Sequence, residues 1–153
     1  ILITHTMNVF GIRQHPEKFI PLVIRSVRDG KGITIHADAT CTIPGSRFYV
    51  SAEDVADGVL FLMKNAKSGE KYNIVGPEET DNLELAQMIA DSVGGTLHAE
   101  LVDYHTSRPG HDLRYALSGG KMRKLGWQPL KSLKQRIDEV VRWTLEHDEW
   151  LGE

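Results

Sequence analysis

The sequence has little of what would assign it to a specialised class of protein. Its 153 residues include a single cysteine, Cys41, which excludes an internal disulfide framework. Aspartate and glutamate (21) outnumber lysine and arginine (18), and the net charge of −3 argues against a nucleic-acid partner bound on a basic face. No apolar run approaches the roughly 20 residues needed to span a bilayer. We therefore expect a folded globular chain with no nucleic-acid or membrane partner.

Two signatures of dinucleotide-dependent catalysis are also missing. A dinucleotide-binding turn needs closely spaced glycines after a strand, and no G-x-G-x-x-G run occurs. A tyrosine base activated by a lysine one helical turn later needs lysine at the fourth position after it. The residues at that offset from the four tyrosines are Glu53, Gly76, Arg108 and Gly119. We therefore assign no catalytic residue to this chain.

The sequence also gives little support for a metal site or a catalytic thiol. The seven histidines include one close pair, His105 and His111, but no HExxH or comparable set of three or four convergent ligands. Ordinary surface histidines explain them better, so we predict no metal site. Cys41 has no identifiable base beside it, which favours a plain thiol over a nucleophile.

The sequence does contain alternating strand and helix patterns. Strands are predicted over 1–9, 33–36, 47–50, 71–75 and 97–102; helices over 16–30, 51–69, 80–94, 120–125 and 132–145. Ser51 to Asp54 supply a cap for one helix; Thr80, Asp81 or Asn82 cap the next, and Ser132 starts the last. This alternation predicts an α/β fold with parallel strand crossovers. Because Ile1 reads as the inside of a strand, we expect the chain to be a piece of something longer.

Three features indicate anion or substrate binding. Arg108 and His111 lie in an RPGHD turn, where a guanidinium fork can grip phosphate, although a solvated structural turn explains the same residues. Asn8 follows a buried strand, at the end where ligands of open α/β sheets gather; a turn-forming asparagine is the alternative. Lys18, in the first turn of the helix predicted over 16–30, can reach a phosphate or face solvent.

A set of segments in fixed order carries a family resemblance. These are TMNVFGIRQHPEKFIPLVI, RFYV, GEKYNIVG, NLELAQMI, RPGHDLRYAL and KLGWQP, and PEKFIPL with RPGHDLRYA about 90 residues on is the specific combination. Over about residues 3 to 145, the chain resembles the C-terminal half of an extended short-chain dehydrogenase/reductase of the NAD-dependent epimerase/dehydratase family. The likeness is strongest to nucleotide-sugar dehydratases of the dTDP-glucose 4,6-dehydratase type.

The resemblance implies roles for individual residues. The positions that match substrate-binding residues are Asn8, Lys18, Thr34, Ile35, His36, Asn73, Arg108 and His111. Val9 replaces a second asparagine near the cofactor. Gly45 stands where the family has a diphosphate-binding arginine, and Arg47, two residues along a strand and so on the same face, is the expected substitute. The segments 37–46 and 51–54 are longer than the family pattern, which leaves the nucleotide and the sugar open.

The resemblance also implies an architecture. Residues 1–153 would be the C-terminal substrate-binding portion of a Rossmann-type enzyme, with strands at 2–6 and 72–74 that complete the edge of an absent NAD-binding sheet. The whole enzyme would be a cytoplasmic lyase acting on a nucleotide-diphosphate sugar. This chain would supply substrate grip, bind no NAD by itself and be inactive alone. The alternatives are a fragment of a nucleotide-sugar 4-epimerase and a free-standing sugar-nucleotide-binding or partner subunit. Homo-oligomers are possible within this interpretation.

Overall fold

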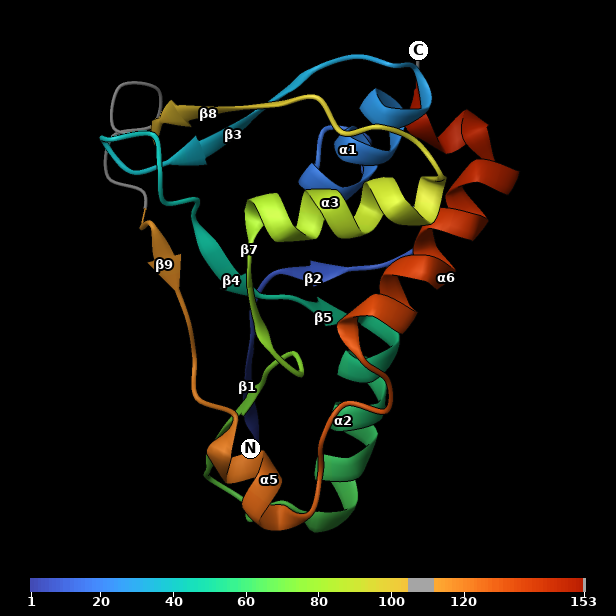
Figure 1. The fold of residues 1–153 in the computed structure, drawn as a ribbon. Helices are drawn as coiled ribbons and strands as arrows, with labels where there is room; N and C mark the ends of the chain where they lie inside the picture. The colour runs from blue at the N-terminus through green and yellow to red at the C-terminus, as the bar shows by residue number, and fades with distance from the viewer. Residues whose placement is uncertain (105–111, 153) are drawn as a thin grey trace.

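The computed structural model describes residues 1–104 and 112–152, and it confirms the α/β class (Figure 1). The strands are β1 (Ile3–Thr6), β2 (Val9–Phe10), β3 (Ile33–Ala37), β4 (Ser46–Phe48), β5 (Val50–Ser51), β6 (Lys71–Ile74), β7 (Glu79–Asp81), β8 (Ala99–Asp103) and β9 (Arg114–Tyr115). The helices are α1 (Phe19–Arg28), α2 (Ala52–Asn65), α3 (Asn82–Val93), α5 (Gly120–Leu125) and α6 (Leu133–Glu146), followed by a 3₁₀ turn, η1 (Asp148–Leu151). None of the described helices is both long and apolar enough to cross a membrane.

The described strands form small sheets rather than one continuous sheet. Strands β1 and β6, β2 and β5, and β3 and β8 pair in parallel. A three-stranded sheet has the order β7-β4-β9, with β4 antiparallel to β7 and parallel to β9. The parallel pairs require crossovers through helices, as the alternating pattern predicts.

Two apolar clusters hold these elements. The larger lies where α1, α3 and α6 pack with β3, at the top of Figure 1, and its fully buried members include Ile24, Leu85 and Ile137. The smaller lies at the bottom, where α2 and α5 pack with β6 around Ile74 and Trp127. Helix α2 and the start of α6 meet between the two clusters.

Local helix signals are confirmed in the structure. The Ser51 hydroxyl accepts the Asp54 N–H and caps α2. Asp81, one of the three predicted candidates, caps α3 in a capping box with Glu84, and Ser132 caps α6 with its partner three residues on. In each cap, the side chain accepts a hydrogen bond from a backbone N–H within one turn of the same helix.

Some boundaries differ from the predictions. The first strand does not run unbroken from residue 1 to residue 9, because Asn8 adopts a left-handed φ of 49° that separates β1 from β2. Helix α1 begins at Phe19 rather than at Pro16, since Lys18 has the extended backbone of an N-cap. Strands β7 and β9 and the η1 turn were not predicted from the sequence.

Candidate functional site

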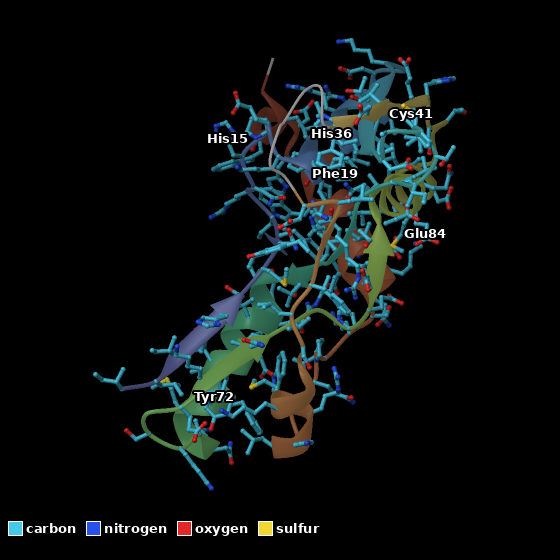
Figure 2. All side chains as sticks on the ribbon, turned by 90° about the vertical axis from the view of Figure 1, so that its left-hand side faces the viewer. His15, Phe19, His36, Cys41, Tyr72 and Glu84 are labelled. Atoms are coloured by element: carbon cyan, nitrogen blue, oxygen red, sulfur yellow. The ribbon has the colours of Figure 1, made fainter. Side chains whose placement is uncertain are left out.

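The main pocket of the described chain lies between β3, β4 and the segment that leads into α1. It has a volume of about 440 Å³, within the range usual for small-molecule sites. Its lining comes from segments far apart in the sequence: Asn8, Glu17, Phe19, Leu22, Thr34, His36, Gly45, Arg47, Tyr49, Asn82, Tyr104, Asp112 and Leu113. Figure 2 shows His36 and Phe19 together in the upper part of the molecule, far from Tyr72 at the lower end.

Strand β3 presents two polar side chains to this pocket by simple alternation. Ile33, Ile35 and Ala37 are buried in the core, while Thr34 and His36 point to the opposite face and line the pocket. Thus, of the three consecutive β3 positions expected at the substrate, the structure brings two to the pocket. The Ile35 side chain, 1% exposed, lies in the apolar core instead.

Arg47 lies in the pocket wall and holds its local backbone together. Its Nη1 donates to the carbonyl oxygens of Ser46 (2.6 Å) and Leu113 (2.7 Å), and its Nη2 donates to that of Asp112 (2.8 Å). These contacts engage three of the five N–H donors of a guanidinium. Arg47 therefore ties β4 to the segment that enters β9 and also brings positive charge to the pocket.

The missing side chain of Gly45 leaves room beside that guanidinium. A Cβ placed on Gly45 would lie 3.5 Å from Asn82 Nδ2 and 3.7 Å from Arg47 Nη1. The same Cβ would lie 3.1 Å from the Leu113 carbonyl oxygen, which already accepts one of the two Nη1 hydrogens, while Ser46 accepts the other. The Asn82 amide is therefore the available donor at this point, and the Arg47 guanidinium supplies positive charge beside it. This arrangement suits an anion with several oxygens, such as a diphosphate.

Tyr49 orients the amide of Asn82. Its hydroxyl donates to Asn82 Oδ1 over 2.7 Å, which turns Nδ2 the other way and leaves it available as a donor. Burial raises the pKa of Tyr49 to about 12, although the nearby Arg47 charge lowers it, so the phenol stays a neutral donor. From the sequence, Asn82 is predicted only as a candidate helix cap. No sequence pattern marks it as a ligand candidate, because β7, the strand that it follows, has only three residues.

Asn8 carries an unmet hydrogen-bond donor beside the pocket. Its Nδ2 is buried and has no hydrogen-bond partner among the described residues. Asn8 also borders a neighbouring pocket of about 320 Å³, which Val9, Gln14 and Lys18 help to line. Because buried donors are nearly always satisfied in folded proteins, this amide is a candidate contact for a bound molecule.

The other residues expected at the site lie apart from the main pocket or cannot be placed. Lys18 and Val9 line the neighbouring pocket only. Asn73 is on β6, where its Nδ2 donates to the Ser118 carbonyl oxygen over 3.0 Å, and it lines neither pocket. Arg108 and His111 lie outside the described residues.

The described residues contain no metal-binding cluster, and the sequence contains no typical dinucleotide-binding turn. Within 1–104 and 112–152, no group of three or more histidine, cysteine, aspartate or glutamate side chains is placed to hold a metal ion. The sequence has no glycine-rich turn between a strand and a helix for a pyrophosphate.

Comparison with known proteins identifies the family of this chain. The profile of the NAD dependent epimerase/dehydratase family matches residues 1–75. The dTDP-glucose 4,6-dehydratase of Salmonella typhimurium is 35% identical over 157 aligned residues, which cover 99% of this chain and 42% of that protein. The structure of a Streptomyces venezuelae dTDP-glucose 4,6-dehydratase with NAD and TYD bound matches with a TM-score of 0.80 and 34% identity, over 99% of this chain and 45% of that one.

A UDP-glucuronic acid 4-epimerase from Bacillus cereus, in complex with UDP-glucuronic acid and NAD, shares the fold, with a TM-score of 0.80 at 23% identity over 96% of this chain and 46% of that one. The chain thus spans less than half the length of the relatives it matches. Because the likeness runs along nearly all of its residues, the chain belongs to the NAD-dependent epimerase/dehydratase family.

Proposed function

We propose that the main pocket binds the diphosphate and nucleoside of a nucleotide sugar, and that the chain supplies the substrate grip of a nucleotide-sugar 4,6-dehydratase. The observation that carries this proposal is the convergence of Arg47, Asn82 and the unpaired amide of Asn8 on one pocket. Thr34 and His36, which line the same pocket from β3, bring a hydroxyl and an imidazole to the base or ribose.

The division of labour within the pocket follows from its charges. Arg47 and the Asn82 amide favour the diphosphate, because its oxygens accept several hydrogen bonds and carry negative charge. We also place Arg108 and His111 at the diphosphate, and Lys18, Asn73 and Val9 nearer the sugar and cofactor, on the strength of the family resemblance alone. In this role the chain's residues bind and orient the substrate; the proton and hydride transfers belong to groups outside it.

The proposed enzyme also needs NAD and a cofactor-binding domain. Relatives of about twice the length are solved with NAD bound, and the described chain offers a face on which such a domain fits. Strand β1 pairs only with β6 among the described residues. Beside this pair, the side chains of Leu60 and Met63 on α2 are 59% and 73% exposed. Parallel strands are usually covered on both faces. We therefore infer that a cofactor-binding α/β unit covers the β1–β6 pair and the exposed apolar side chains beside it.

The fold alone also accommodates a 4-epimerase, and a free-standing binding subunit remains the other candidate. The dehydratase assignment is favoured because the relatives above 30% identity include dTDP-glucose 4,6-dehydratases, whereas the epimerase match is at 23%. Inactivity of the chain alone and a cytoplasmic location stay predictions.

Calorimetric titration of the purified chain with dTDP-glucose, UDP-glucose and NAD⁺ tests the proposal. We expect a sugar nucleotide to bind and NAD⁺ not to bind. Asn8→Gly keeps the left-handed backbone and removes the amide, so it should weaken binding about tenfold or more, as for a lost hydrogen bond to a charged ligand. Gln87→Ala removes an exposed amide whose Nε2 donates to Asp91 on the same helix, and it serves as the control.

Each result has a distinct meaning. Failure of the unaltered chain to bind either sugar nucleotide would refute the proposed substrate grip. Binding of NAD⁺ would contradict the separation of substrate and cofactor sites. Binding that Asn8→Gly and Gln87→Ala leave equally unchanged would remove Asn8 from the site.

A further inference from the structure

The loop between β2 and α1, residues 11–18, carries pocket residues on a strained backbone. Glu17 lines the main pocket, and Gln14 and Lys18 line the neighbouring one. Arg13, just before these residues, has a φ of 60°, a left-handed conformation that residues other than glycine, asparagine and aspartate adopt rarely. A loop with such a residue keeps one conformation only where other contacts hold it.

The C-terminal part of the chain provides those contacts. The Arg13 guanidinium carbon lies 5.7 Å from the ring centre of Trp143 and 5.7 Å from that of Trp150. Trp143 also stacks on His147, with ring centres 4.3 Å apart and planes 9° from parallel. We call Trp143, His147 and Trp150 the aromatic brace; cations within about 6 Å of such rings are attracted to them.

Two further contacts join the C-terminal segment to α1 and to the loop. Arg25 Nη1, on α1, donates to the Leu151 carbonyl oxygen over 3.0 Å. A Cβ on Gly152 would lie 3.6 Å from Cγ of Pro16, so the end of the described chain rests against the loop. Leu151 itself is fully buried in the larger apolar cluster. The brace is therefore anchored in the core and cannot shift freely with the loop.

We propose that Arg13 is a positioning residue. Its contact with the aromatic brace holds the 11–18 loop in one conformation, and in that conformation the loop presents Glu17 and Lys18 to a bound sugar nucleotide. This inference rests on the proposed function of the pocket. It assigns to the C-terminal segment, which lines neither of the two pockets, a part in substrate affinity. The contact is not a ligand site in itself, because Arg13 already occupies the aromatic faces.

Three variants of Arg13 separate the side-chain contact from the backbone strain. Arg13→Lys keeps a cation over the rings, Arg13→Gly relieves the left-handed backbone without a side chain, and Arg13→Ala loses the contact and keeps the strain. Lys121→Ala is the matched control, because it removes another cation–ring contact, 4.1 Å from Tyr72, at the opposite end of the molecule. Hydrogen–deuterium exchange reports order in the 11–18 loop without ligand, and calorimetry reports dTDP-glucose affinity.

We expect Arg13→Ala to raise exchange in residues 11–18 and to weaken dTDP-glucose binding about three- to tenfold, with Arg13→Lys close to the unaltered protein. Unchanged exchange in Arg13→Ala would overturn the bracing role. Raised exchange with unchanged affinity would overturn its part in binding, and full recovery in Arg13→Gly would assign the effect to backbone strain instead. If the unaltered protein binds no sugar nucleotide, the proposed function fails and takes this part in binding with it, while exchange still decides whether Arg13 orders the loop.

Discussion

The Asp54 carboxylate of α2 and the Arg136 guanidinium of α6 form a two-point ion pair in the interior of the protein. Arg136 Nη2 and Nε donate to the two carboxylate oxygens over 2.8 and 3.0 Å. The residues are 1% and 8% exposed, and the Ser51 hydroxyl and the Leu130 N–H also donate to Asp54. Helix α2 packs in the smaller apolar cluster and helix α6 in the larger one. The ion pair therefore links the two clusters of the fold.

Removing one partner of this pair should be costly. Asp54→Ala leaves the buried Arg136 guanidinium with only the half-exposed Glu139 carboxylate, 3.1 Å from Nη1, as an acidic partner, and we expect the free energy of unfolding to fall by about 3 kcal/mol. The double variant Asp54→Ala with Arg136→Met removes both charges and should regain most of that loss. Urea unfolding measures both. Equal destabilisation in the single and double variants would show that the charges are not coupled.

The same pair predicts a loss of stability in acid. Burial raises the pKa of Asp54, but hydrogen bonds from Arg136, Ser51 and the Leu130 N–H outweigh it and hold the pKa below its usual value. A carboxyl with a lowered folded pKa stabilises the fold above its unfolded pKa, and the stabilisation disappears as pH falls through the folded pKa. As pH falls below the ordinary aspartate pKa of about 3.9, the unfolding free energy should therefore fall more steeply in the unaltered protein than in the double variant. Parallel curves would contradict the assignment.

Gly76 should tolerate no side chain. A Cβ there would lie 1.9 Å from the Tyr49 carbonyl oxygen, a backbone atom that cannot turn aside. We expect Gly76→Ala to lower the free energy of unfolding by at least about 3 kcal/mol. At Gly32 a Cβ would meet only the His98 carbonyl oxygen, at 3.6 Å, so Gly32→Ala should stay within about 0.5–1 kcal/mol of the unaltered protein. Thermal or urea unfolding of the two variants gives the comparison.

Tyr49 should ionise later than an ordinary tyrosine. Because burial raises its pKa to about 12, the ultraviolet titration of tyrosinate should include one late step that disappears in Tyr49→Phe. The folded pKa lies above the unfolded value, so the unfolded state releases its proton first and stability falls with rising pH between about 10 and 12. Tyr49→Phe also leaves Asn82 Oδ1 without its donor, at a cost of about 1 kcal/mol. A late step that persists in Tyr49→Phe would belong to another residue.

Short-range signals were enough for much of the fold. The caps at Ser51 and Ser132 are readable because each satisfies groups within its own helix turn. The alternation along β3 predicts which side chains share a face. Strands β7 and β9, of three and two residues, are too short for a period to show and exist because β4 pairs with both. The break at Asn8 is likewise invisible to a hydrophobic pattern, since Met7 and Phe10 on either side of it are both buried.

By itself the sequence determined the α/β class, most helix boundaries, the absence of a glycine-rich cofactor turn and the family, because these depend on residues close together or on the order of motifs along the chain. Only the tertiary structure decided that Arg47 and Asn82 face one pocket, that Asn73 and Ile35 lie elsewhere, and that Arg13 meets the C-terminal tryptophans. These relationships join residues far apart in the chain. Their distances are set by how the helices pack, which no local pattern encodes.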